Sequence, residues 1–134
     1  MKKKIIFVCT GNSCRSQMAE GIMKHLAGDQ FDVYSAGVSP IEIQPKTFIV
    51  MSEKGIDISD QRPNHIDDYK DIDFDYVITL CGHAKETCPV FKGAQNLHWP
   101  ITDPYNATGS DDAKLTAYRQ SRDDIWSQIQ AFMN

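Results

Sequence analysis

The sequence predicts an α/β fold in which a four-stranded parallel sheet is flanked by helices on both faces. Short apolar runs rich in β-branched residues alternate with longer segments whose apolar residues recur every three or four positions. Such alternation is typical of parallel sheets, because two parallel strands need a crossover connection and helices usually provide it. The length of 134 residues suits one domain, which we expect to span residues 1–134.

The individual elements follow from apolar spacing and from turn residues. The expected strands are 3–8, 32–36, 76–80 and 96–99. The expected helices are 15–26, one that begins at Pro45 and ends before Gly55, a short one over 66–70, and a long one over 111–133. The glycine-bracketed segment 82–93 is interpreted as a loop or a short helix. Ligands of such sheets bind beyond the carboxyl ends of the strands.

Composition excludes several classes of function. The net charge of −4 argues against a nucleic-acid binder. No apolar run approaches the roughly 20 residues that a membrane-spanning helix needs. The basic start Met1–Lys4 precedes only a short apolar run that leads straight into a motif, so we do not interpret it as a signal peptide and expect a cytoplasmic protein. We also expect the protein to be a monomer. Its four cysteines are then not expected to form structural disulfides.

The most informative segment is the loop that follows the first strand. Cys9 ends the strand, and Arg15 follows it after five residues, at the start of a helix. Glycine and asparagine tolerate unusual backbone angles, so the loop can turn its N–H groups inward at a helix N-terminus. The site would hold a tetrahedral oxyanion and favour a nucleophilic thiolate on Cys9. The residues expected to bind the anion are Thr10, Gly11, Asn12, Ser13, Cys14 and Arg15.

Other residues near this loop have both a chemical and a structural interpretation. Ser16 could donate a hydrogen bond from its hydroxyl to the sulfur of Cys9. The structural alternative for Cys9 is a buried residue at the end of a strand, because cysteine is often buried. Cys14 is interpreted as a small packing residue, with a redox partner of Cys9 as the alternative. Cys81 also ends a predicted strand, so it could share a crevice with Cys9.

Several segments, in the same order, resemble the low-molecular-weight protein tyrosine phosphatase family. The similarity is greatest to its thioredoxin-coupled arsenate reductase branch. The matching segments are CTGNSCRSQMAEG (9–21), VYSAG (33–37), GIDIS (55–59), VITLCGHAKETCP (77–89) and the Asp103–Pro104 pair. The resemblance covers nearly the whole chain, and it implies a phosphatase-like fold and a role in arsenic detoxification.

The resemblance also implies a relay of three thiols. Cys9 would attack arsenate while Arg15 and the loop amides stabilise the oxyanion, and Asp103 would protonate the departing oxygen. Cys81 would then attack the arsenic adduct, which releases arsenite and leaves a Cys9–Cys81 disulfide. Cys88 would transfer this bond to a Cys81–Cys88 disulfide, and thioredoxin would reduce it.

No tightly bound cofactor is expected. The family has a potassium site near the loop, and Asn12, Glu20 and Ser35 match three of its contributors. Asn64 stands where the family pattern has aspartate, which weakens the prediction of a potassium site.

Two other functions remain open at this point. The first is a tyrosine phosphatase that works through a phosphocysteine on Cys9; Tyr105 after the Asp103–Pro104 pair resembles the phosphatases and suggests at least weak activity on aryl phosphates. The second is a non-enzymatic zinc module built from the cysteines and His83. Its spacings, four residues between the first two cysteines and six between the last two, do not match common zinc motifs.

Overall fold

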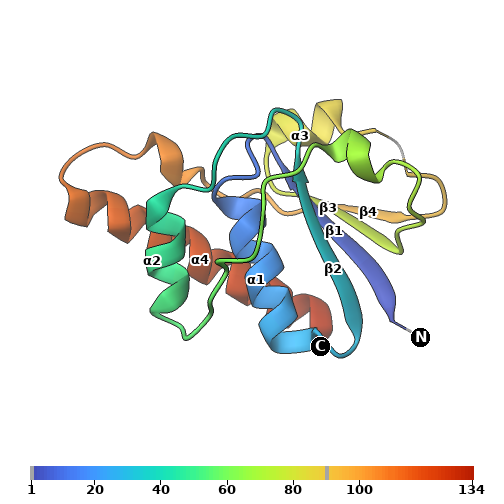
Figure 1. The fold of residues 1–134 in the computed structure, drawn as a ribbon, viewed down its shortest axis with the longest axis horizontal. Helices are drawn as coiled ribbons and strands as arrows, with labels where there is room; N and C mark the ends of the chain where they lie inside the picture. The colour runs from blue at the N-terminus through green and yellow to red at the C-terminus, as the bar shows by residue number, and fades with distance from the viewer. Residues whose placement is uncertain (1, 90) are drawn as a thin grey trace.

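A single parallel sheet organises the molecule. The computed structural model describes residues 2–89 and 91–134, and Figure 1 shows the sheet with helices around it. Four strands pair in the order β2-β1-β3-β4, and every pairing is parallel. The strands are β1 (Lys3–Cys9), β2 (Phe31–Gly37), β3 (Tyr76–Thr79) and β4 (Gln95–His98). The predicted fold class is confirmed, and each strand lies within one residue or two of its expected range.

The helices also begin and end close to their predicted positions. They are α1 (Arg15–Ala27), α2 (Pro45–Ser52), α3 (Gly82–Thr87) and α4 (Asp111–Met133), with short 3-10 helices η1 (Ile66–Tyr69) and η2 (Pro104–Asn106). Local chemistry explains the boundaries. Pro45 occupies the first turn of α2, where its missing N–H costs nothing. Ser110 caps α4 by accepting a hydrogen bond from the N–H of Ala113.

Both faces of the sheet are buried. Successive residues of β1 point to opposite faces, so that Ile5 and Phe7 enter one hydrophobic core and Ile6 and Val8 enter the other. The first core contains apolar residues of α1, α2 and α4, and the second contains residues around η1 and α3. Figure 1 shows α1, α2 and α4 together on one side and α3 on the other. This arrangement leaves the carboxyl edge of the sheet free to carry loops.

The strand register brings the predicted functional segments to that edge. Cys9 lies opposite Gly37 of β2, and Val8 lies opposite Thr79 of β3. Cys81 therefore comes two residues beyond the paired part of β3, beside the loop that follows Cys9. The predicted proximity of these two cysteine-bearing segments follows directly from the parallel pairing.

An ion-pair network joins α2 to α4. The carboxylate of Glu53, just after α2, accepts two hydrogen bonds at 3.0 Å and one at 2.7 Å from Arg119. The buried guanidinium of Arg122 donates to Glu53 at 2.8 Å and to the carbonyl of Val50 at 2.9 Å. Hydrogen bonding from Arg119, followed by that from Arg122, lowers the pKa of Glu53 from 4.5 to about 2.

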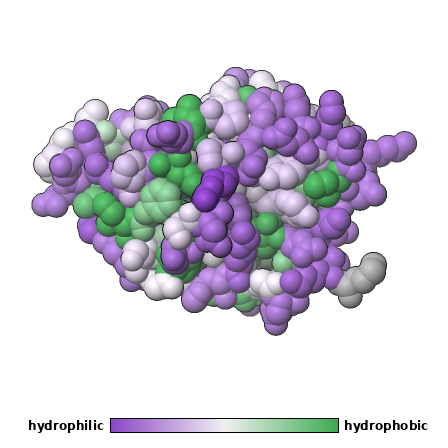
Figure 2. Space-filling model, in the orientation of Figure 1, coloured by the Kyte–Doolittle hydropathy of each residue, from purple (hydrophilic) through white to green (hydrophobic). Residues whose placement is uncertain are grey.

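The surface is largely hydrophilic on the face shown in Figure 2, with small hydrophobic groups toward the side where α2 lies. The exposed large apolar residues include Ile41, Phe48 and Ile49, which belong to α2 and the loop before it. Within the described residues, no helix is both long and apolar enough to span a membrane.

The Glu53 network predicts a pH-dependent contribution to stability. Because folding lowers the pKa of Glu53, its contribution is fully present above pH 4.5 and is lost as the pH falls through about 2. We expect Glu53→Gln to lower the free energy of unfolding by about 1 kcal/mol at pH 7, a modest value because a third of the carboxylate is exposed. The difference from the wild type should shrink as the pH falls from 4.5 to 2, measured by urea unfolding.

The matched control is Glu42→Gln, which removes an exposed carboxylate that pairs with no described residue. It should leave stability unchanged at both pH values. If Glu53→Gln lowers the free energy of unfolding by the same amount at every pH down to 2, the effect does not come from the charge of Glu53.

Candidate active site

Two hydrogen bonds hold the sulfur of Cys9 in the first loop. The Cys9 side chain is buried, and its Sγ lies 2.9 Å from Oγ of Ser16. The backbone N–H of Asn12 donates to the same sulfur across 3.3 Å. The N–H of Asn12, and the hydroxyl of Ser16 when it donates, would stabilise a negative charge on the sulfur.

The loop forms a cradle of backbone N–H groups. Asn12 has a φ of +49°, a left-handed conformation that asparagine tolerates better than most residues. Among the hydrogen bonds of the described residues, none is donated by the N–H groups of Gly11, Ser13, Cys14 or Arg15. A cavity of about 210 Å³ opens over this loop; it is lined by Cys9, Thr10, Gly11, Ser13, Cys14, Arg15, Ser39, Ile41, Asp103 and Tyr105. Five of the six predicted anion-binding residues line the cavity, and the sixth, Asn12, is fully buried.

A charged pair closes one side of the cavity. The guanidinium of Arg15 is largely buried and donates to the carbonyl of Ile101 across 3.1 Å. Its other terminal nitrogen lies 3.3 Å from a carboxylate oxygen of Asp103, whose side chain is 31% exposed. The Asp103 carboxylate also accepts a hydrogen bond from the N–H of Tyr105, which caps η2. Arg15 of α1 and Asp103, the cap of η2, therefore line the same cavity.

The amide of Asn12 lies at the centre of a buried polar network. Its Nδ2 donates to Ser16 Oγ at 2.7 Å and to Ser35 Oγ at 2.9 Å, while its Oδ1 accepts from the backbone N–H of Asn64. Ser35 in turn donates to a carboxylate oxygen of Glu20 across 2.6 Å. These bonds tie the loop to β2, to α1 and to the segment before η1.

The two other predicted redox cysteines lie at the two ends of α3. Cys81 caps the helix by accepting from the N–H of Ala84, and its sulfur lies 3.2 Å from Oγ1 of Thr10 in the first loop. Cys88 lies at the opposite end of the helix and lines a separate cavity of about 270 Å³. Burial raises the pKa of the Cys88 thiol to about 11. All four cysteines are free thiols.

The side chain of Cys14 packs toward α4. It is buried, its sulfur lies 3.5 Å from the hydroxyl of Tyr118 on α4, and burial raises the pKa of its thiol. Burial also raises the pKa of Tyr118, so this hydroxyl stays protonated in the contact.

Sequence reasoning missed two contributors to the site. Gly37 ends β2, and a Cβ there would lie 2.6 Å from the carbonyl oxygen of Thr10 and 2.9 Å from the nitrogen of Asn12. Lys24 forms an ion pair with Glu20, and its spacing of four residues on a helix is a signal that could have revealed it.

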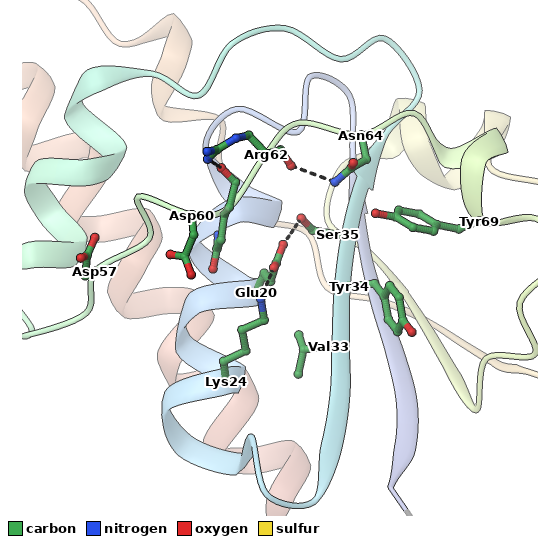
Figure 3. Close-up of a pocket in the computed structure, with 11 residues that line it drawn as sticks. Glu20, Lys24, Val33, Tyr34, Ser35, Asp57, Asp60, Arg62, Asn64 and Tyr69 are labelled. Atoms are coloured by element: carbon green, nitrogen blue, oxygen red, sulfur yellow. Dashed lines mark hydrogen bonds and ion pairs between the residues drawn. The ribbon is translucent and has the colours of Figure 1, made fainter.

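The residues that match the potassium site lie together in space. Figure 3 shows Glu20 between Lys24 and Ser35, with Asn64 above them. The Asn12 amide oxygen and the Ser35 hydroxyl are both engaged within the protein, and the Asn64 side chain donates to the carbonyl of Arg62. The Asn64 Oδ1 takes no part in that bond, so the weak potassium site stays a prediction. No group of three metal-binding side chains occurs in the described part of the chain, so the zinc alternative gains no support.

Comparison with known proteins extends these observations. Residues 4–134 match the model of the low molecular weight phosphotyrosine protein phosphatase family. An arsenate reductase from Halalkalibacterium halodurans is 46% identical, over 98% of this chain and 95% of that protein. The solved structure of an arsenate reductase in the phosphate-binding state is 34% identical with a TM-score of 0.84, over 98% and 96% of the two chains.

A further solved structure is the thioredoxin-dependent arsenate reductase of Corynebacterium glutamicum. It is 30% identical with a TM-score of 0.66, and the match covers 98% of this chain and 63% of that one.

The close approach at Gly37 predicts that the cradle depends on this glycine. We expect Gly37→Ala to push the backbone of the loop at Thr10 and Asn12 and to weaken inorganic phosphate binding by about tenfold. Isothermal titration calorimetry would measure the dissociation constant. Gly82→Ala is the control, because a Cβ there meets nothing within 4 Å. An unchanged dissociation constant for Gly37→Ala would show that the loop adapts without cost.

Proposed function

The chain belongs to the low molecular weight phosphotyrosine protein phosphatase family, and on that premise we propose that it reduces arsenate to arsenite through a relay of three thiols regenerated by thioredoxin. The observation that carries the proposal is the placement of two further thiols. Cys81 touches the oxyanion loop at Thr10, and Cys88 lies at the far end of the same short helix. Hydrolysis of a phosphate ester would need Cys9 alone.

The arsenate reductase activity is supported by relatives matched over nearly their full length. Proteins of that name from several bacteria are 41–46% identical to this chain. Arsenate and phosphate are both tetrahedral oxyanions, so a cradle suited to one also accepts the other.

The first step is attack of the Cys9 thiolate on arsenic(V). A sulfur–arsenic bond forms, and one arsenate oxygen departs as water after protonation. Asp103 is placed to supply a proton, since its carboxyl group faces the cavity beside Arg15. Arg15 and the loop N–H groups hold the remaining oxygens and stabilise their negative charge.

The second step transfers two electrons. The Cys81 thiolate attacks the sulfur of Cys9, the sulfur–arsenic bond breaks, and its electron pair stays on arsenic. Arsenic(III) leaves as arsenite, and Cys9 and Cys81 are joined by a disulfide. The contact of Cys81 with Thr10 puts it beside the loop, and its sulfur accepts a hydrogen bond from the N–H of Ala84.

The third step requires α3 to unwind. Seven residue steps separate Cys81 from Cys88, and at 1.5 Å per helical residue their Cα atoms lie about 10 Å apart. A disulfide needs a separation below about 7 Å. Burial also keeps the Cys88 thiol protonated in the helical form. Unwinding would both shorten the distance and expose Cys88, so that it can attack Cys81 and release Cys9.

Thioredoxin is the proposed reductant for the final Cys81–Cys88 disulfide. Support comes from the Corynebacterium glutamicum relative, a thioredoxin-dependent arsenate reductase that is similar over nearly all of this chain. A disulfide at an exposed, unwound segment is accessible to a protein thiol.

A second activity, hydrolysis of aryl phosphates, is favoured by one observation. Tyr105 is 52% exposed and lines the cavity mouth together with Ile41, which is 45% exposed. These apolar walls suit an aromatic ring attached to a phosphate held by the loop. Cys9 would then form a phosphocysteine, and water would hydrolyse it.

A coupled assay tests the proposed function. The protein with arsenate, thioredoxin, thioredoxin reductase and NADPH should consume one NADPH for each arsenate reduced, measured at 340 nm. The Cys9→Ser variant should consume none. If NADPH is not consumed while aryl phosphate is hydrolysed rapidly, the phosphatase interpretation replaces the reductase.

The relay predicts a specific outcome for Cys88→Ser. Without the third thiol, the Cys9–Cys81 disulfide cannot be resolved, so each molecule should reduce at most one arsenate. Peptide mass mapping after arsenate exposure without reductant should find Cys9–Cys81 in this variant and Cys81–Cys88 in the wild type. Multiple turnovers of Cys88→Ser with thioredoxin would contradict the relay.

A further inference from the structure

The carbonyl oxygens of the loop after β1 are hydrogen-bonded to neighbouring segments. The segment 38–44, between β2 and α2, donates backbone N–H groups at 2.9–3.2 Å to the carbonyl oxygens of Cys9, Thr10, Gly11 and Ser13. The C=O and N–H of a planar trans peptide unit point in opposite directions. A bond that holds a carbonyl oxygen therefore also sets the direction of the N–H of the following residue.

The peptide unit between Gly11 and Asn12 shows this effect. Its carbonyl oxygen accepts from the N–H of Ile41 across 2.9 Å, and its own N–H donates to Sγ of Cys9 across 3.3 Å. The carbonyl is thus turned toward the segment 38–44, and the N–H is turned toward the sulfur inside the loop. We expect the same orientation in the other peptide units of the loop whose carbonyl oxygens are held by that segment.

The peptide unit between Ser13 and Cys14 is held by two donors. Its carbonyl oxygen accepts from the N–H of Gln44 at 3.1 Å and from Oγ1 of Thr47 at 3.0 Å. Thr47 lies in the first turn of α2 and is fully buried. The N–H of Cys14 consequently points away from α2, and Cys14 lines the cavity over the loop.

The helix that carries Thr47 is itself attached to α4. The buried guanidinium of Arg122 donates to the carbonyl of Val50 at 2.9 Å, and Lys46 forms an ion pair with Asp111 at 3.6 Å. The Thr47 hydroxyl therefore bonds to the loop from a packed helix. A bond from such a support restricts rotation of the Ser13–Cys14 peptide unit.

We propose that Thr47, together with the backbone N–H of Gln44, positions the N–H of Cys14 for oxyanion binding. The two donors hold the Ser13 carbonyl toward α2, so that the Cys14 N–H is directed into the cavity before the anion arrives. A donor that is already oriented costs no reorganisation when the anion binds. Thr47 is thus a positioning residue. The proposal needs only the oxyanion cavity of the proposed function, and neither arsenate reduction nor thioredoxin.

Binding of inorganic phosphate tests this role without any reduction step, so its failure is distinct from failure of the proposed function. Thr47→Val keeps the branched shape of the side chain and removes the hydroxyl. We expect the dissociation constant of phosphate, measured by isothermal titration calorimetry, to rise about fivefold, the effect of one lost hydrogen bond. Thr47→Ser keeps the hydroxyl and should bind phosphate like the wild type.

The amide signal of Cys14 separates positioning from a merely structural role. In two-dimensional proton–nitrogen NMR spectra of the wild type, phosphate should move the Cys14 amide proton downfield, because that proton gains a hydrogen bond. In Thr47→Val at saturating phosphate this shift should be smaller, whereas the Gly11 amide should shift as in the wild type. A structural role alone would lower the thermal stability and leave the saturated Cys14 shift unchanged.

The second donor provides an independent arm. Gln44→Pro removes the N–H that binds the same carbonyl oxygen, and the φ of −70° at Gln44 suits proline. It should also weaken phosphate binding about fivefold, whereas Gln44→Ala, which keeps the N–H, should bind like the wild type. A folded Thr47→Val with the wild-type dissociation constant overturns the proposal, and so does wild-type binding by Gln44→Pro if Thr47→Val does not fold.

Discussion

The side-chain amide of Asn12 is the interaction on which the candidate site depends. It is fully buried, and it joins the loop after β1 to Ser16 at the start of α1, to Ser35 in β2 and to the backbone of Asn64. Its own backbone has a left-handed conformation and donates its N–H to Cys9. A buried amide with every group satisfied strongly favours one arrangement of the segments that it joins, because any other leaves polar groups without partners.

The rigidity of this loop contrasts with the short helix that carries the other thiols. The loop around Cys9 is packed between two buried strands and tied by side-chain hydrogen bonds. Helix α3 has six residues and one cap from Cys81, and helices this short gain little stability of their own. A fixed oxyanion cradle beside an easily unwound helix is the division of roles that the proposed relay requires, since the anion is held for the attack of Cys9 and the helix unwinds only after arsenite has left.

The sequence predicted much of the fold because local patterns and tertiary packing agree. The residues of α4 recur at helical spacing and their apolar side is the side that packs on the first core, so its range of 111–133 was predicted to the residue. The sequence did not decide whether the segment 82–93 forms a loop or a short helix, because its few residues show no full helical repeat of apolar side chains. The helix cap at Cys81 also depends on where β3 ends. The need for a glycine at position 37 was not predicted, because the close contact there is with Thr10, which is far away in the sequence.

The sequence by itself determined the chemical groups: a cysteine and an arginine with five residues between them around a turn, and two later cysteines that set this chain apart from a simple phosphatase. Spacing along the chain is enough for this, because strand, turn and helix start are local structures. Only the tertiary structure decided which of those groups meet. Parallel pairing set Cys81 against Thr10, and packing of α1 against β2 joined Lys24, Glu20 and Ser35 into one network. Such contacts depend on strand register and helix packing, which no local pattern specifies.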